Sequence, residues 1–173
     1  MTDTWHLAQL NIGRLVAPEG DPRVAGFYAD LDRINALADT APGFVWRLVD
    51  PDGQDATGLR PFDEDTLVNL SVWTSVEALY DFTYRSAHLD VLRRRRDWFR
   101  PYGDAYSVLW WIPAGTLPTI EEAGARLATL RVEGATAEAF TLRIPFGVPA
   151  GARISRAARD EGPENVYSGH QAR

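Results

Sequence analysis

The sequence contains no cysteine and no lysine. Without cysteine, the protein cannot use disulfides, thiol nucleophiles or cysteine-ligated metals. Without lysine, it cannot form a lysine Schiff base with a substrate. The lack of cysteine fits a reducing compartment, so we expect a cytoplasmic protein.

Long hydrophobic runs and an excess of basic residues are also missing. No apolar stretch approaches the roughly 20 residues of a membrane span, and the N-terminus lacks the basic and apolar regions of a signal peptide. The formal net charge is −6, whereas nucleic-acid-binding domains carry a basic surface. We therefore expect neither a membrane nor a nucleic-acid partner. Glycine-rich nucleotide motifs and the GxSxG hydrolase motif are absent as well.

The 173 residues are enough for one domain with a full core. We expect this domain over residues 1–146. Residues 147–173 show little apolar periodicity and mixed charge, which predicts a flexible C-terminal tail.

Four strands and three helical regions are predicted from the spacing of apolar residues. Alternation predicts strands at residues 5–15, 44–49, 66–73 and 105–112. Helical spacing predicts helices at 24–38, at 75–99 with a bend near 84–85, and at 119–134. The expected caps are Asp21, Ser75 and Thr119, the last with Glu122 as its capping-box partner. We interpret the long polar connection 50–65 as an excursion that covers a pocket as a lid.

The order of these elements is β-α-β-β-α-β followed by an extra helix. This order predicts an α+β fold, the ferredoxin-like split βαβ plait with a four-stranded antiparallel sheet. Its helices cover one face of the sheet, so the other face needs a cover. Trp110 and Trp111 are adjacent in a strand and must face opposite sides. We expect a second copy to bury the exposed one, which predicts a homodimer through the sheet face.

A resemblance to a known family is carried by four blocks in the right order: HLAQLNIGR, VNLSVWTSVEALYDFTYRSAH, LRRRRDWF and ARLATLRVEGATAEAFTLRIPF. Over residues 5–146 the chain resembles the domain-of-unknown-function 3291 family. That family is similar to the antibiotic-biosynthesis-monooxygenase group of dimeric α/β barrels. The resemblance implies a dimeric α/β barrel, an aromatic or polycyclic phenol as substrate, and oxidation by dioxygen without metal, flavin or haem.

The resemblance also implies residues for a site. Some members of the monooxygenase group place an Asn and a Trp four apart on the third strand, then a Tyr and an Arg on the following helix. Asn69 and Trp73 have this spacing, with Ser71 between them on the same strand face. Tyr80 follows near the position of the Tyr, and the run at 93–96 contains four candidates for the Arg.

Two further candidates come from the helix that ends at residue 99. His88 lies one turn after Tyr84, and either side chain would move a proton to or from a phenol. Arg95 and Arg96 lie nearest the apolar stripe of that helix, so either would bind an anion. The structural alternatives are a histidine bonded at the edge of the core, and arginines paired at the surface with Asp90 and Asp97.

These observations predict a small natural-product biosynthetic enzyme that oxidises an aromatic compound like a cofactor-independent monooxygenase. A cyclase or isomerase that works by proton transfer stays open. So does a non-catalytic ligand-binding or haem-binding dimer with His88 or His6 as axial ligand, or a purely structural dimer. We expect no metal site. The predicted catalytic residues are His88, Tyr84 and Asn69, and the predicted substrate-binding residues are Trp73, Ser71, Tyr80, Arg95 and Arg96.

Overall fold

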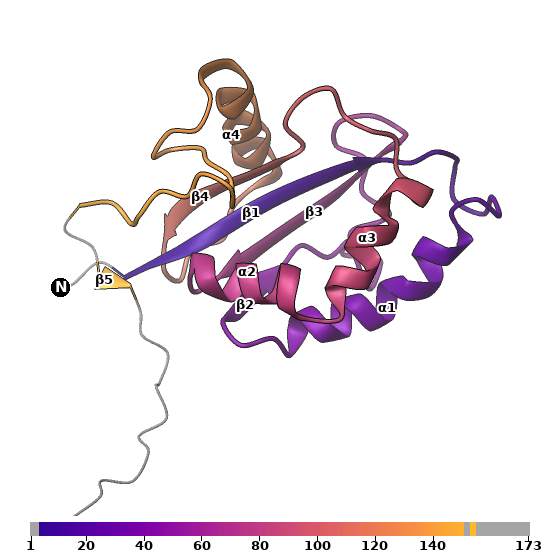
Figure 1. The fold of residues 1–173 in the computed structure, drawn as a ribbon, viewed down its shortest axis with the longest axis horizontal. Coiled ribbons are helices and arrows are strands. Elements are labelled where there is room, and N and C mark those ends of the chain that lie inside the picture. Colours follow the sequence, from indigo (N-terminus) through magenta and orange to yellow (C-terminus); the bar gives the residue numbers. More distant parts are fainter. Residues whose placement is uncertain (1–3, 151–152, 155–173) are drawn as a thin grey trace, which may run out of the picture.

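The computed structural model describes residues 4–150 and 153–154 (Figure 1). Its elements, in chain order, are β1 (Thr4–Arg14), α1 (Ala25–Asp39), β2 (Phe44–Arg47), β3 (Thr66–Trp73), α2 (Val76–Arg85), α3 (His88–Trp98), β4 (Ser107–Pro113), α4 (Ile120–Glu133) and β5 (Arg153–Ile154).

The main sheet has the strand order β2-β3-β1-β4, with every neighbouring pair antiparallel. This order is the split βαβ plait, so the predicted fold class is confirmed. The short strand β5 pairs in parallel with the start of β1. In the central pair of strands, Asn11 of β1 lies directly opposite Asn69 of β3.

Helices cover both faces of the sheet. Figure 1 shows α1, α2 and α3 on one side and α4 on the other. Odd-numbered residues of β1, such as Leu7, face the first side, where they pack with Leu79 of α2. Even-numbered residues, such as Leu10, pack with Leu127 and Leu130 of α4. The predicted extra helix is therefore the cover of the second face.

The premise of the sheet-face dimer, an exposed apolar face, is wrong for this chain. Trp110 is fully buried on the side of α4, and its Nε1 donates a hydrogen bond to Oε1 of Glu122 at 3.0 Å. Trp111 faces the other side and is 8% exposed, with its Nε1 donating to the carbonyl of Phe146 at 2.9 Å. Both indoles are thus buried and bonded within one chain, because α4 and the segment before residue 147 provide the covers.

Two of the three predicted caps form. The hydroxyls of Ser75 and Thr119 each accept a hydrogen bond from the backbone N–H three residues later, at 3.1 Å. The reciprocal bond expected from Glu122 does not form, because its carboxylate accepts the Trp110 N–H. The cap predicted at Asp21 is wrong, since the N-cap of α1 is Val24 and the Asp21 carboxylate is held by Arg23.

The bend expected near residues 84–85 is a complete break between α2 and α3. Ser86 is extended, with φ −108° and ψ 178°, and its hydroxyl accepts the backbone N–H of His88 at 3.1 Å. Tyr84 and His88 therefore belong to different helices, and their expected position one turn apart on one helix is wrong.

The first residues of the expected C-terminal tail pack on the domain. Val148 is partly buried against the cluster around Trp111, and β5 lies at residues 153–154. Residues 151–152 and 155–173 lie outside the described part of the chain, so the flexible tail stays a prediction. Among the described helices, none has the length and apolar character to cross a bilayer.

Candidate functional site

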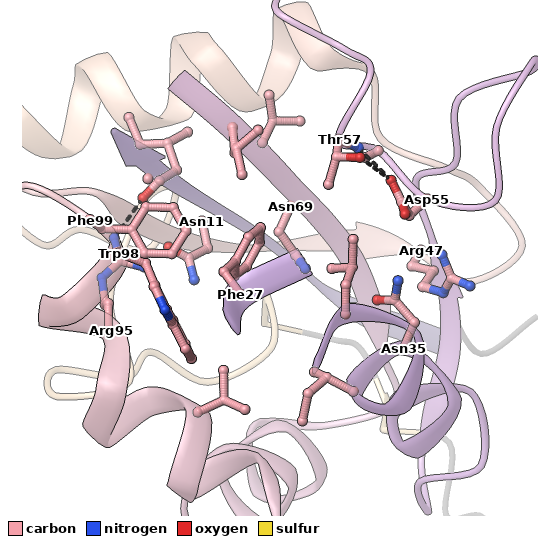
Figure 2. Close-up of a pocket in the computed structure, with 18 of the residues that line it drawn as sticks. Asn11, Phe27, Asn35, Arg47, Asp55, Thr57, Asn69, Arg95, Trp98 and Phe99 are labelled. Carbon is pink, nitrogen blue, oxygen red and sulfur yellow. Dashed lines mark hydrogen bonds between the residues drawn. The ribbon is translucent and has the colours of Figure 1, made fainter. Parts of the chain in front are cut away.

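A pocket with a cavity volume of about 150 Å³ lies between the sheet and the helices α1 and α3 (Figure 2). Its floor is formed by residues 11–13 of β1 and 67–70 of β3. The connection after β2 places Asp55, Ala56 and Thr57 at its edge. The predicted covering position of segment 50–65 thus includes three pocket residues, whereas its movement as a lid stays a prediction.

One face of α3 supplies the most reactive side chains of the wall. His88, Leu92 and Arg95 line the pocket at spacings of four and three residues, which is one face of an α-helix, and Phe99 follows at the C-cap of α3. This spacing selects a single arginine from the run 93–96.

The neighbouring arginines of the run lie outside the pocket. Arg93 pairs with Asp90 at 3.7 Å, as the structural alternative predicted. Arg94 pairs with Asp30 of α1 at 3.4 Å and with Asp97 at 3.9 Å. All three ion pairs are between exposed or partly exposed groups, and pairs of this kind contribute only about 0–1 kcal/mol.

Arg95 is held in place without a carboxylate partner among the described residues. Its Nη2 donates to the backbone carbonyl of Ile12 at 2.9 Å. Its guanidinium carbon lies 4.9 Å from the ring centroid of Phe99 and 4.5 Å from that of Tyr106. Burial lowers the pKa of Arg95 from its usual value, but an arginine stays protonated at neutral pH. The pocket wall therefore carries one oriented, uncompensated positive charge with donors left over.

Asn11 and Asn69 form a pair of carboxamides on the floor. They are opposite each other across the antiparallel strands, and Figure 2 shows both side chains pointing from the sheet toward the ring of Phe27. Asn69 is the one exposed residue of β3, so it reaches solvent-accessible space. The Oδ1 atom of Asn11 is buried without a hydrogen-bond partner, so this carboxamide is not fully hydrogen-bonded within the described part of the chain.

The polar groups on the far side of the pocket are already engaged. The Arg47 guanidinium binds both oxygens of Asp39, at 2.8 and 3.2 Å. The Asp55 carboxylate accepts bonds from the backbone N–H and the hydroxyl of Thr57, at 2.7 and 2.6 Å. Asn35 of α1 also lines this side. The free cation of the pocket is thus at the Arg95 end.

His88 is set up as a neutral base. Its Nδ1 lies 3.4 Å from the carbonyl oxygen of Thr83, and its ring is 4.8 Å from that of Phe82. Since a carbonyl only accepts, Nδ1 carries the hydrogen and Nε2 has a free lone pair. Burial lowers the pKa of His88 below its ordinary 6.5, which favours the neutral imidazole near pH 7.

Three of the eight predicted site residues line the pocket: Asn69, His88 and Arg95. Trp73 and Ser71 share the strand face of Asn69 as predicted but lie in the core, where the indole N–H donates to the Ser71 hydroxyl at 3.0 Å. The indole of Trp73 also stacks on Phe82 at 5.0 Å.

The remaining three predicted residues are exposed and do not line the pocket. Tyr80 and Tyr84 are on the outer side of α2, because α2 turns Leu79 and Phe82 to the sheet instead. Their ring centroids are 4.9 Å apart. Arg96 is exposed and is not among the residues that line the pocket. Within the described part of the chain, no group of three or more His, Asp or Glu side chains lies close enough together to hold a metal ion. His6 lies in β1 among the residues that face α4.

Sequence reasoning did not identify Asn11, Asn35 and Trp98 as pocket residues. Asn11 could have been predicted, because the antiparallel register that pairs β1 with β3 places it directly opposite Asn69. Asn35 occupies the same helical face as Phe27 and Leu31, at spacings of eight and four residues. Trp98 is 3% exposed and reads as an ordinary core residue.

The family model described as "Domain of unknown function (DUF3291)" matches residues 6–156. The chain belongs to this family. Comparison with functionally curated proteins gives no match.

Several solved structures resemble this DUF3291 protein. SnoaB, a cofactor-independent oxygenase from Streptomyces nogalater, is 20% identical with a TM-score of 0.41, over 66% of this chain and 98% of that chain. A protein of unknown function from Nitrosomonas europaea is 12% identical with a TM-score of 0.43, over 68% and 98%. A proposed antibiotic biosynthesis monooxygenase from Chloroflexus aurantiacus is 15% identical with a TM-score of 0.38, over 66% and 98%. Similarity at this level carries no conclusion about activity.

Proposed function

We propose that this protein is a small enzyme that oxidises a hydroxylated aromatic compound with dioxygen and without a bound cofactor. The observation that carries the proposal is the uncompensated guanidinium of Arg95 in a pocket that also holds a neutral histidine. A phenol becomes an electron donor when it is deprotonated, and this pair of residues favours that state.

Each of the three pocket residues has a defined part. Nε2 of His88 accepts the phenolic proton, as a positioned general base does. Arg95 stabilises the resulting anion in a partly buried site, where an electrostatic interaction is stronger than in bulk water. Asn69 donates a hydrogen bond to the phenolic oxygen, which becomes a carbonyl oxygen when the ring is oxidised.

The chemistry balances with dioxygen as the oxidant. The phenolate passes one electron to dioxygen, which gives an aryloxyl radical and superoxide. The two radicals combine through a new carbon–oxygen bond, and the resulting ring-bound peroxide takes up a proton. Loss of the hydrogen on the same carbon breaks the O–O bond and releases water. The sum is a phenol plus one dioxygen giving a quinone plus one water.

The proposal is tested by oxygen uptake with a panel of phenols, combined with mass spectrometry under ¹⁸O₂. We expect oxygen consumption with one ¹⁸O atom in the product. We expect a loss of at least about 100-fold in His88→Gln, since general bases contribute roughly 10²–10⁴-fold. Arg96→Gln is the matched control and keeps the rate, because Arg96 is exposed outside the pocket.

Two results would replace this function. A product of unchanged mass that forms equally fast under argon would identify the proton-transfer alternative, a cyclase or isomerase. A bound haem, visible as a Soret band in the purified protein, would move the chemistry away from cofactor-free oxidation.

A further inference from the structure

The donors of the pocket lie in a row across its floor. Nη2 of Arg95 is bonded to the carbonyl of Ile12, the residue next to Asn11. Asn11 in turn lies opposite Asn69. Figure 2 shows the order Arg95, Asn11, Asn69 from one end of the pocket to the middle. A ligand on this floor would therefore have a cation at one end and two neutral carboxamides beside that cation.

The spacing of the row fits oxygens on neighbouring atoms of one ligand. Side chains directly opposite each other in an antiparallel pair have Cβ atoms about 4.5–5.5 Å apart. Two carboxamides at this separation can share one ligand oxygen or hold two adjacent oxygens. Since Arg95 retains donors beyond the one used on Ile12, it can bind the outer oxygen of the same group.

The walls and the charge limit what the rest of the ligand can be. Phe27, Leu92 and Trp98 line the cavity, whose volume is about 150 Å³. An apolar cavity of about this size in another protein holds one benzene ring. Arg47 is neutralised by Asp39, so the Arg95 charge is left for one anionic group.

We propose that the pocket binds a single-ring hydroxybenzoate whose carboxylate is ortho to the hydroxyl, that is, a salicylate-type anion. Arg95 and Asn11 bind the carboxylate, and Asn69 binds the adjacent phenolic oxygen. This inference rests on the proposed function only for the fate of the ligand, since binding is independent of turnover.

The inference is tested by calorimetric titration of the protein with three probes of similar size. Salicylate carries both groups in the ortho arrangement, 4-hydroxybenzoate separates them, and salicylamide removes the charge. We expect salicylate to bind most tightly. We expect 4-hydroxybenzoate to bind about threefold or more weakly, for one lost hydrogen bond, and salicylamide about tenfold or more weakly, for a lost charged bond.

Variants assign the contacts. Arg95→Gln is expected to lose about tenfold or more in salicylate affinity and to leave salicylamide nearly unchanged. Arg96→Gln, one residue further along α3 and exposed, is expected to keep both affinities. Asn69→Ala reduces salicylate binding and, because Asn69 is already exposed, leaves the folded state intact. Equal binding of salicylate and salicylamide, or wild-type affinity in Arg95→Gln, would overturn the inference, as would no binding at all.

Failure of this inference can be told apart from failure of the proposed function. Salicylate that binds as expected but consumes no oxygen, alone or beside other phenols, contradicts the oxidase proposal and keeps the ligand class. Oxygen uptake with larger neutral phenols, together with no salicylate binding, contradicts the proposed ligand class and keeps the oxidase proposal.

Discussion

The guanidinium of Arg95 is stacked between two rings, Phe99 from the end of its own helix and Tyr106 from the segment before β4, the latter at 4.5 Å. Tyr106 stacks further on Tyr102, with ring centroids 6.0 Å apart. A charge held in this way is oriented before any ligand arrives. The contact with Tyr106 thus joins the loop before β4 to the pocket wall.

Loss of the Tyr106 ring is expected to weaken anion binding through Arg95. An exposed cation–π contact contributes about 0.5–1 kcal/mol, so Tyr106→Leu should reduce affinity for an aromatic carboxylate about two- to fivefold. Tyr106→Phe keeps the ring face and is expected to keep the affinity. Titration of both variants checks this, and an equal loss in Tyr106→Phe would show that the hydroxyl, and not the ring face, is what matters.

The lowered pKa of His88 predicts a loss of stability in mild acid. Its ordinary pKa is 6.5 and burial lowers it in the folded protein. Between the folded value and 6.5, the unfolded chain binds more protons, so the free energy of unfolding falls as the pH falls through this window. His88→Gln should flatten this part of the curve, measured by urea denaturation at pH 7.5 and pH 5.5.

His6 provides the comparison for this measurement. Burial lowers its pKa as well, so it contributes to acid sensitivity with the same sign, from the other face of the sheet. His6→Gln and the double variant separate the two contributions. An unchanged pH dependence in His88→Gln would mean that His88 titrates alike in both states.

Gly13 is expected to tolerate no side chain. A Cβ placed on it would lie 2.6 Å from two carbons of the Phe99 ring, so the ring and the end of α3 would have to move. Such overpacking costs typically about 1–3 kcal/mol, and Gly13→Ala should also disturb the pocket that both residues line. Gly103→Ala is the control, since nothing lies within 4 Å of its Cβ position. Thermal unfolding of the two variants compares them, and equal stability would contradict the packing argument.

The bond between Trp110 and Glu122 is expected to anchor α4. Glu122→Ala leaves the buried indole N–H without its acceptor, which costs about 1–3 kcal/mol. Glu122→Gln retains an acceptor and should cost less, and Glu121→Ala, exposed on the same turn, should be nearly neutral. Denaturant titrations of the three variants test this order. A Glu122→Ala protein as stable as Glu121→Ala would show that water replaces the acceptor.

The fold and part of the pocket could be predicted from the sequence, for physical reasons that differ by residue. The alternation of β1 and β3 and the caps at Ser75 and Thr119 are local signals, and the structure has them. Asn69 could be identified because a polar side chain among apolar strand residues costs stability unless it is hydrogen-bonded or binds a ligand. Its partner Asn11 depends on strand register, which is set by contacts far apart in sequence.

Which side chains of α2 and α3 face the same way could not be predicted, because one residue between the two helices breaks their common helical periodicity. Ser86 is extended, so α3 starts anew and His88 follows its own rotation, independent of Tyr84. The same break sets which arginine of the run faces the pocket. The face of the sheet on which α4 packs could also not be predicted from the spacing of its apolar residues, since an amphipathic helix does not specify which face of a sheet it covers.

The position of α4 on the second face has a consequence for how the protein responds to dilution. A sheet that is covered by another molecule loses its cover as the concentration falls, whereas α4 is tethered to β4 by the residues after Pro113. A tethered segment acts at a high effective concentration that does not depend on how much protein is present. The burial of Trp110 and its neighbours is therefore intramolecular. The midpoint of unfolding of that core should be the same in a concentrated stock and in a nanomolar assay.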